Sequence, residues 1–389
     1  KHSALAVMVC PTPNHWYSTA REGVDILDRM QQPLHAVAAA SHPAPYGYYR
    51  RLREQAPLYF DSTLKLWVAT SHAVVEAALQ SPALRVRPPA EPVPRALLGL
   101  PAGEVFANLV RMNDGAFHAA HKPQLRQSAR RWTLAQIAHA SREATRALQP
   151  VLGVNDFLTA LPAQVMARLL GVPEPQLQQT TQWAHDFSAG IGAGASLDAI
   201  ARASEAAAGL LAQGAALGYC AVQAANRIAL MQQSLDATAG LLGNTVYLLQ
   251  QRPEFGVQVA ASPDFTREFV AEVVRWDAPV QNTRRFAAED LMLCGEPIRQ
   301  GDGLLLVLAS ANRDATLNPQ PDRFEVQRLQ RRNLTFGAGV HACPAEQIAI
   351  EIVAVCIDTI YATAYFDSYF GRVSGYRPLP NVRIPVFAH

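Results

Sequence analysis

The chain has few charged side chains and no excess of either sign. Charged residues make up 17% of its 389 residues, and 34 Lys and Arg nearly balance 32 Asp and Glu, which leaves a formal net charge of +2. Nucleic-acid-binding proteins draw much of their affinity from an excess of basic groups that contact phosphates. The balanced charge therefore argues against nucleic acid as a partner.

Long hydrophobic runs are also missing. The longest run near the start, Ala4 to Cys10, has seven residues, whereas a membrane-spanning helix needs about 20. This run lacks the positive flank and the small-residue cleavage site of a signal peptide. Because the sequence begins with Lys1 rather than Met, we expect the natural N-terminus to precede it. We predict no membrane partner.

Cysteine is scarce and scattered. The five cysteines, an odd number without a CxxC pair, are Cys10, Cys220, Cys294, Cys343 and Cys356. This spacing argues against a disulfide framework and against a zinc or iron–sulfur cluster. It favours a reducing, cytoplasmic location.

Apolar residues, at 49%, are abundant enough for a large core, so global disorder is excluded. Length alone suggests two or three domains, but we find neither an internal repeat nor a low-complexity linker. Strands do not alternate regularly with helices along the chain. The pattern therefore predicts a mostly α fold with a small β-sheet region.

Up to about Gln251 the composition favours helices, with Pro or Gly at the breaks. The expected helices begin near Pro45 and cover His72 to Gln80, His118 to Ala140, Leu161 to Leu170, Gln176 to Phe187, Asp198 to Leu217, Ala221 to Gln250 and Asp264 to Trp276, with a last helix after Cys343. The expected strands are Leu58 to Phe60 and Leu64 to Thr70, which form a hairpin, and Leu291 to Leu293 and Leu304 to Leu308. The helix ending at Gln250 is long and apolar, so we expect it to be central.

One segment carries the strongest functional signal. The stretch from Phe336 to Ala345 reads FGAGVHACPA, with glycines that permit tight turns and a cysteine just before an expected helix. Backbone N–H groups at a helix start stabilise a thiolate. The segment resembles the haem-binding loop of the cytochrome P450 family, FGxGxHxCxG, except that Ala345 replaces the last glycine. The resemblance implies that Cys343 is the axial ligand of haem b (iron protoporphyrin IX) and that Phe336 and Gly337 belong to the cofactor-binding loop.

Further segments match the family in order and spacing. Glu272 and Arg275 fit its ExxR element, whose members share one helical face. The stretch PDRF resembles its meander, so Arg323 is expected to complete a Glu–Arg–Arg cluster with a structural role. The resemblance covers nearly the whole chain and implies a single triangular cytochrome P450 domain over residues 1–389, with a partly irregular N-terminal segment, 1–43.

The resemblance also implies which residues hold the haem propionates. By position these are Arg285 and His341, together with His118 and Lys122 of an HxxxR-like element in which lysine replaces arginine. Lysine offers a point charge rather than the planar fork of arginine, and a solvated helix face is the alternative for these two residues.

The central helix departs from the family element AGx(D/E)T, which delivers protons to bound oxygen. The equivalent residues read QSLDA, so the acid is kept as Asp236, but Ala237 occupies the threonine position and Thr238 lies one residue, about 100°, further around the helix. Ser234 replaces a glycine. The candidates for proton transfer are Asp236, Ser234 and Thr238, with ordered water or a group of the substrate as alternatives.

We therefore predict a bacterial-type monooxygenase that inserts one oxygen atom of O₂ into a small or medium, largely apolar substrate. The family implies electrons from a ferredoxin or flavodoxin and an NAD(P)H-dependent reductase. The candidate pocket residues by family position are Gln232, Leu235, Asp236, Ala237, Val280, Gln281 and Asn282. A docking patch for an acidic electron donor is expected from two basic groups, Arg126, Arg130 and Arg131 in one and Arg331 and Arg332 in the other, with ordinary solvated arginines as the alternative.

Two alternatives stay open because of Ala237. The first is a haem-thiolate enzyme of atypical chemistry, either peroxide-driven or a non-oxygenating rearrangement catalyst. The second is a non-catalytic protein that binds haem and a ligand.

Overall fold

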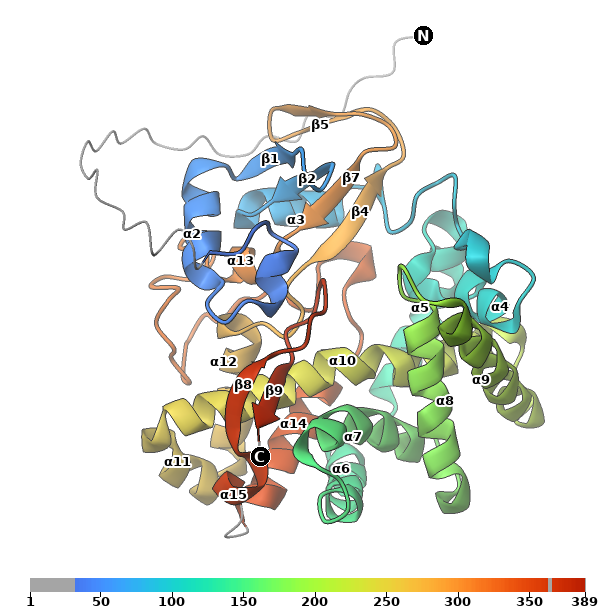
Figure 1. Ribbon diagram of the computed structural model, residues 1–389, viewed down its shortest axis with the longest axis vertical. Coiled ribbons are helices and arrows are strands. Elements are labelled where there is room, and N and C mark those ends of the chain that lie inside the picture. The colour runs from blue at the N-terminus through green and yellow to red at the C-terminus, as the bar shows by residue number, and fades with distance from the viewer. Residues whose placement is uncertain (1–31, 363–365, 389) are drawn as a thin grey trace.

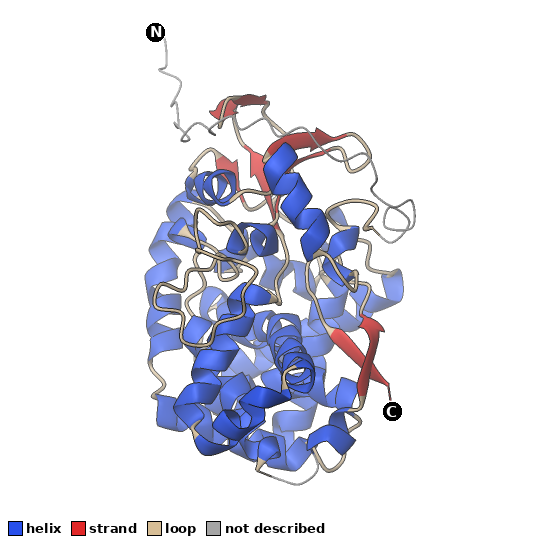
Figure 2. Ribbon diagram, turned by 90° about the vertical axis from the view of Figure 1, so that its left-hand side faces the viewer, coloured by secondary structure: helices blue, strands red, loops and turns tan. Residues whose placement is uncertain are grey.

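The structure is a computed structural model that describes residues 32–362 and 366–388. Helices fill most of the molecule, and strands are confined to one end and to a separate pair near the C-terminus (Figures 1 and 2). The predicted class, mostly α with a small sheet region, is confirmed. Most of the predicted N-terminal segment 1–43, including Cys10, lies outside the described residues.

The α-helices of the described chain are α2 (Tyr46–Gln55), α3 (His72–Gln80), α4 (Pro101–Ala107), α5 (Gly115–Arg130), α6 (Leu134–Leu148), α7 (Val154–Leu169), α8 (Leu177–Gly190), α9 (Leu197–Ala216), α10 (Ala221–Gln251), α11 (Gly256–Ala261), α12 (Pro263–Trp276), α13 (Leu308–Asn312), α14 (Glu346–Tyr361) and α15 (Phe366–Phe370). Short 3₁₀ helices include η3 (Val110–Met112) and η6 (Gly339–His341). The strands are β1 (Leu58–Asp61), β2 (Leu66–Ala69), β3 (Leu84–Arg85), β4 (Thr283–Ala287), β5 (Leu291–Leu293), β6 (Glu296–Ile298), β7 (Gly303–Leu306), β8 (Arg372–Tyr376) and β9 (Pro385–Ala388).

A five-stranded sheet in the order β1-β2-β7-β4-β3 joins the N-terminal hairpin to strands from the last third of the chain. β2 and β7 are parallel and pair Val68 with Leu305, while β4 is antiparallel to β7 and pairs Arg285 with Leu304. Two hairpins, β5–β6 and β8–β9, stand apart from this sheet. The sheet therefore fixes Arg285 at a defined register.

α10 is the central helix, as the sequence predicts. Its 31 residues span about 46 Å, and it packs against α7, α8, α9, α12 and α14. Figure 1 shows it crossing the molecule beneath the sheet. Because neighbours surround it, most of its residues are buried, and apolar ones such as Ile228, Leu242 and Val246 belong to the largest hydrophobic core.

Three sequence predictions are corrected here. The single helix expected from His118 to Ala140 is two helices, because Thr133 begins a new one: its Oγ1 accepts from Gln136 N–H and the Gln136 amide accepts from Thr133 N–H, a capping box. α14 is not the last helix, since α15 follows it, and the strands β8 and β9 come after α15. Cys294 is disulfide-bonded, so the scattered spacing did not exclude every bridge.

No helix within residues 32–362 and 366–388 is long and apolar enough to cross a membrane.

Candidate active site

The cysteine loop is closed by its own backbone. Cys343 N–H donates to Phe336 O at 2.8 Å, and Gly337 N–H donates to Leu334 O at 2.8 Å. Gly337 and Gly339 have φ of 72° and 67°, the left-handed region that glycine adopts without strain. Ala345, which replaces the family's last glycine, has φ of −117°, so a side chain is tolerated there.

The Cys343 side chain is exposed on this loop, three residues before α14. Ala345 N–H donates to its Sγ at 3.4 Å, which is the predicted backbone support for a thiolate. Crowding by protein atoms around the sulfur nevertheless raises the pKa of the thiol, and Ala345 N–H and the charge of Lys122 only partly oppose this. The expected stabilising contact is thus present but is outweighed by desolvation.

Two histidines from distant parts of the chain meet beside this loop. The rings of His118 on α5 and His341 in η6 stack with centroids 4.3 Å apart at 45°. His341 Nε2 lies 2.9 Å from Asp114 Oδ1, which fixes the orientation of that ring. The Asp114 carboxylate also accepts from Val86 N–H; burial alone would raise its pKa, but these hydrogen bonds hold the pKa below its ordinary value.

His118 is buried, and its Nε2 has no hydrogen-bond partner among the described residues. Desolvation first, then the positive charges of His341 and Lys122, lower the pKa of His118 to about 4. Lys122, also buried, donates from Nζ to Ala342 O at 2.9 Å, and this hydrogen bond links α5 to the cysteine loop.

Arg285 reaches the same region from β4. The residue is buried, its Nη1 donates to Arg284 O at 2.8 Å, and it forms no ion pair within the described chain. Burial lowers its pKa, and Asp114 partly offsets that shift. A buried cation and an unpartnered imidazole nitrogen are costly unless an anion binds. These residues therefore fit a group that carries carboxylates, as haem does.

The ExxR pair forms as predicted and is fully buried. Arg275 Nη2 lies 2.6 Å from Glu272 Oε1 and its Nε lies 3.0 Å from Oε2. The two further arginines on Glu272 are Arg328 at 3.4 Å and Arg331 at 3.1 Å. The prediction that Arg323 completes this cluster is wrong: its side chain is exposed, and only its carbonyl takes part, accepting from Arg275 at 3.0 Å.

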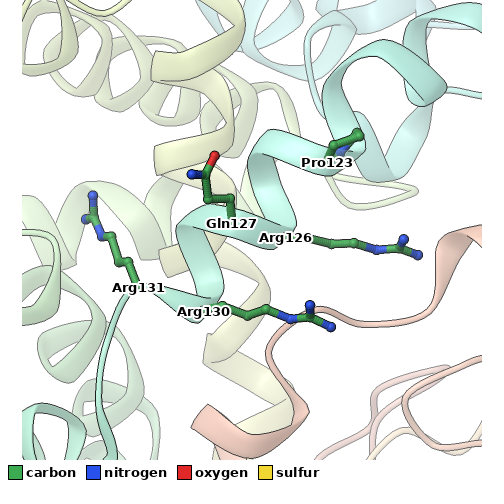
Figure 3. Close-up of a pocket in the computed structure, with 5 residues that line it drawn as sticks. All are labelled: Pro123, Arg126, Gln127, Arg130 and Arg131. Atoms are coloured by element: carbon green, nitrogen blue, oxygen red, sulfur yellow. The ribbon is translucent and has the colours of Figure 1, made fainter.

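The predicted docking patch loses one of its members, Arg331, to the cluster around Glu272. Arg331 also pairs with Glu268 at 2.9 Å and donates to Val326 O, so it is part of the core around Glu272 rather than a free surface charge. Arg332 is exposed. The other three arginines line a shallow groove on α5 with Pro123 and Gln127. In Figure 3, Arg126 and Arg130 extend to one side of the helix, and Arg131 extends to the opposite side.

α10 presents a half-buried acid, Asp236, that is followed by Ala237 and so has no hydroxyl at the next position. Desolvation raises the pKa of Asp236, and the charges of Arg377 and His185 oppose the shift. The helix is α-helical throughout, so no bulge turns buried Thr238 toward the position of Ala237. The Ser234 hydroxyl donates to Met231 O at 2.7 Å, within its own helix.

The predicted pocket residues separate into two groups. Gln281 and Asn282 are buried structural amides: Gln281 bonds Tyr49 and Ala278 O, and Asn282 donates to Pro380 O at 2.9 Å. These contacts already use their amides, and their assignment to the pocket stays a prediction. Leu235 and Gln232 are buried, and Ala237 and Val280 are half-buried.

Sequence reasoning missed two residues at this site. Asp114 fixes His341, and the signal for it was the acid at the start of α5, four residues before His118. Arg111 in η3 donates from Nη2 to Gln232 Oε1 at 3.4 Å, and Gln232 Nε2 donates to Ser188 Oγ at 3.0 Å. No pattern in the sequence distinguished Arg111 from the other arginines.

A family model described as cytochrome P450 matches residues 248–361. The chain is 26% identical to the biotin biosynthesis cytochrome P450 of Bacillus subtilis (strain 168), over 87% of this chain and 95% of that protein. It is 29% identical to the mycinamicin IV hydroxylase/epoxidase of Micromonospora griseorubida, over 76% of this chain and 81% of that protein.

Solved structures have the same fold. A crystal structure of P450BioI in complex with acyl carrier protein ligated to hexadec-9Z-enoic acid superimposes with a TM-score of 0.72 at 26% identity, covering 88% of this chain and 96% of that one. The crystal structure of CalO2 superimposes with a TM-score of 0.75 at 20% identity, covering 88% and 94%.

Proposed function

The chain belongs to the cytochrome P450 family, and from this premise we propose that it is a haem-thiolate monooxygenase that binds haem b through Cys343. Its class is that of an oxidoreductase that incorporates oxygen. The substrate we propose is small or medium and largely apolar, and one oxygen atom of O₂ enters it. We also propose that residues 1–389 form a single domain.

The observation that carries this proposal is the convergence of buried, unsatisfied nitrogen groups beside the cysteine loop. His118 Nε2 has no partner, and Arg285 has no acidic partner within the described chain. Propionate carboxylates would satisfy both groups. His341, oriented by Asp114, would contribute a further donor.

Each residue of this site then has a defined task. Haem, once bound, would supply the iron at which O₂ is activated, and a thiolate ligand would increase the electron density of that iron. Cys343 provides that thiolate, and Lys122 fixes the loop through Ala342 O. Phe336 and Gly337 close the loop around the sulfur. Three cationic or donor side chains would hold the propionates and so orient the ring: His118, Arg285 and His341.

Asp236 is the proposed proton carrier. Its raised pKa means that it keeps a proton at a higher pH than an exposed aspartate does, which suits a group that must both hold and release one. Ala237 offers no hydroxyl, and the Ser234 hydroxyl is already donated to Met231 O. We therefore propose that the proton passes from Asp236 through ordered water or through a polar group of the substrate.

The groove on α5 supports docking of an acidic electron donor. Arg126, Arg130 and Arg131 are exposed there, and none of them forms an ion pair within the described chain. We propose a ferredoxin or flavodoxin as the donor, reduced by an NAD(P)H-dependent reductase, and the cytoplasm as the compartment. Long-range attraction between such surfaces speeds association.

The test is the carbon monoxide difference spectrum of the haem-loaded, dithionite-reduced chain. We expect the Soret band that gives the family its name, which requires a thiolate on iron. Cys343→His should move that band to the imidazole-type position. Cys220 is also exposed but lies far from Cys343 in the sequence, so Cys220→Ser should leave the band unchanged. Absence of the thiolate band from the wild-type chain would contradict the proposal.

One observation favours a second candidate, peroxide-driven oxygenation. No alcohol on α10 is placed to organise proton delivery, because Ala237 has none and Ser234 is bonded within the helix. Peroxide already carries both electrons and protons, so it bypasses that step. Turnover with peroxide alone, without turnover from a reconstituted ferredoxin system, would select this candidate.

A further inference from the structure

Arg111 is a cation without an acidic partner. It lies in η3, and the only hydrogen bond of its side chain within the described chain is the long one, 3.4 Å, from Nη2 to the neutral amide of Gln232. Its Nε is inaccessible to solvent and has no partner. No carboxylate of the described residues forms an ion pair with it.

The guanidinium is charged in spite of its surroundings. The residue as a whole is half-buried, but protein atoms surround the guanidinium, and this desolvation lowers its pKa to about 10. It therefore remains protonated at neutral pH. An ionised group so placed costs free energy unless an anion approaches it.

The contact with Gln232 locates Arg111 relative to the reaction site. Gln232 and Asp236 are four residues apart on α10, so they share one face of that helix. Gln232 also donates to Ser188 on α8. Arg111 thus lies where η3, α8 and α10 meet, on the face that carries the proposed proton donor.

Arg111 is separate from the propionate-binding group. Asp114 influences the charge state of His118 and of Arg285, whereas no charged residue contributes to the shift of Arg111. The one hydrogen bond of the guanidinium within the described chain is to Gln232, so it lies against α10. A carboxylate there has a planar, two-donor partner available.

We propose that Arg111 binds the carboxylate of the substrate, so that the enzyme selects apolar acids over neutral molecules of the same shape. This inference rests on the proposed function, because it assigns the substrate class of the same site. Gln232, whose amide in turn donates to Ser188, holds the guanidinium in position.

The experiment compares acids with matched alcohols on the haem-loaded chain. The probes are decanoate against decanol and 4-ethylbenzoate against 4-ethylbenzyl alcohol, and binding is measured both by the spin-state shift of the Soret band and by calorimetry. The wild-type chain should bind at least one acid about tenfold or more tightly than its alcohol. Arg111→Gln should abolish that preference without weakening alcohol binding, Arg111→Lys should keep part of it, and the exposed Arg95→Gln should keep all of it.

Several outcomes overturn the inference. The first is that the wild-type chain prefers neither acid over its matched alcohol, or binds neither acid at all. The second is that the preference for an acid survives in Arg111→Gln. A third is loss of haem from Arg111→Gln with unchanged acid preference in the fraction that keeps haem, which would assign Arg111 to a propionate. A chain that binds the acid through Arg111 but oxidises nothing would contradict only the proposed function, since calorimetry does not depend on turnover.

Discussion

The imidazole rings of His118 and His341 are in tilted contact, with centroids 4.3 Å apart, which joins α5 to the cysteine loop across 223 positions of sequence. Asp114 holds His341 from the other side, and His118 is left with an unpartnered Nε2. The pair therefore presents one oriented donor and one unsatisfied nitrogen on the same surface, beside Cys343. This surface is the part of the site that we expect to respond most directly to haem.

Replacing His118 with Phe should weaken haem retention. Phenylalanine keeps a ring for stacking but removes Nε2, so one propionate contact is lost, worth about 1–2 kcal/mol or roughly a tenfold faster release. Transfer of haem to apomyoglobin measures that rate. His121→Phe, on the same helix and stacked on Phe117, is the matched control. Equal release rates in both variants would remove His118 from the haem site.

The stability of the haem-free chain should depend on pH through His118. In the unfolded chain the pKa of His118 is near its ordinary value of 6.5, whereas in the folded chain burial lowers this pKa to about 4. The unfolded state therefore binds more protons in this window, and the free energy of unfolding falls as the pH drops from 6.5 toward 4. Urea unfolding at several pH values should show this loss in the wild type and a smaller one in His118→Phe. If stability fell with pH by the same amount in the wild type and in His118→Phe, the low pKa of His118 would not be the cause.

Arg331 should matter for stability, and Arg323 should not. Arg331→Ala leaves Glu272 with a missing partner in a buried cluster, which we expect to cost about 2 kcal/mol or more. Arg323→Ala truncates an exposed side chain and keeps the carbonyl that Arg275 uses, so a change below about 0.5 kcal/mol is expected. The free energy of unfolding of the two variants, measured by chemical denaturation, decides whether Arg331 or Arg323 belongs to the cluster around Glu272.

Asp236→Asn should lower turnover driven by O₂ and reduced ferredoxin by at least about tenfold, because the amide cannot release a proton. Turnover driven by peroxide should change little, since that route does not need the same protons. The two rates measured on one preparation separate proton delivery from damage to the pocket. Asp198→Asn, an exposed acid on α9, is the control. Equal losses on both routes would point to a structural role for Asp236.

Charge reversal in the α5 groove should weaken reduction by the electron donor. Arg126→Glu combined with Arg130→Glu replaces two exposed cations on one side of the helix. We expect the KM for a ferredoxin to rise about tenfold at low salt and the difference to shrink as salt screens the charges. Arg202→Glu on α9 provides the comparison. A salt-independent effect, or none, would move the docking surface elsewhere.

The sequence by itself determined the local features of this protein. The cysteine loop, the ExxR pair and the long central helix each depend on residues close together in the chain, and the structure has them where the sequence predicts. The break at Thr133 was readable too, since its capping box spans only four residues. Such features form through backbone conformation and contacts between near neighbours, which residue type and spacing specify directly.

Only the tertiary structure decided which distant side chains meet. Arg323 and Arg331 are both arginines in one loop-rich segment, and whether either reaches Glu272 depends on how that segment folds back over α12. The amide oxygen of Gln281 accepts a hydrogen bond from Tyr49 on α2, a contact between residues 232 positions apart. The isolation of Arg111 was equally invisible, because a missing partner is a property of the packed surroundings and not of the residue. Burial and pairing arise when segments distant in sequence pack together, so no local pattern specifies them.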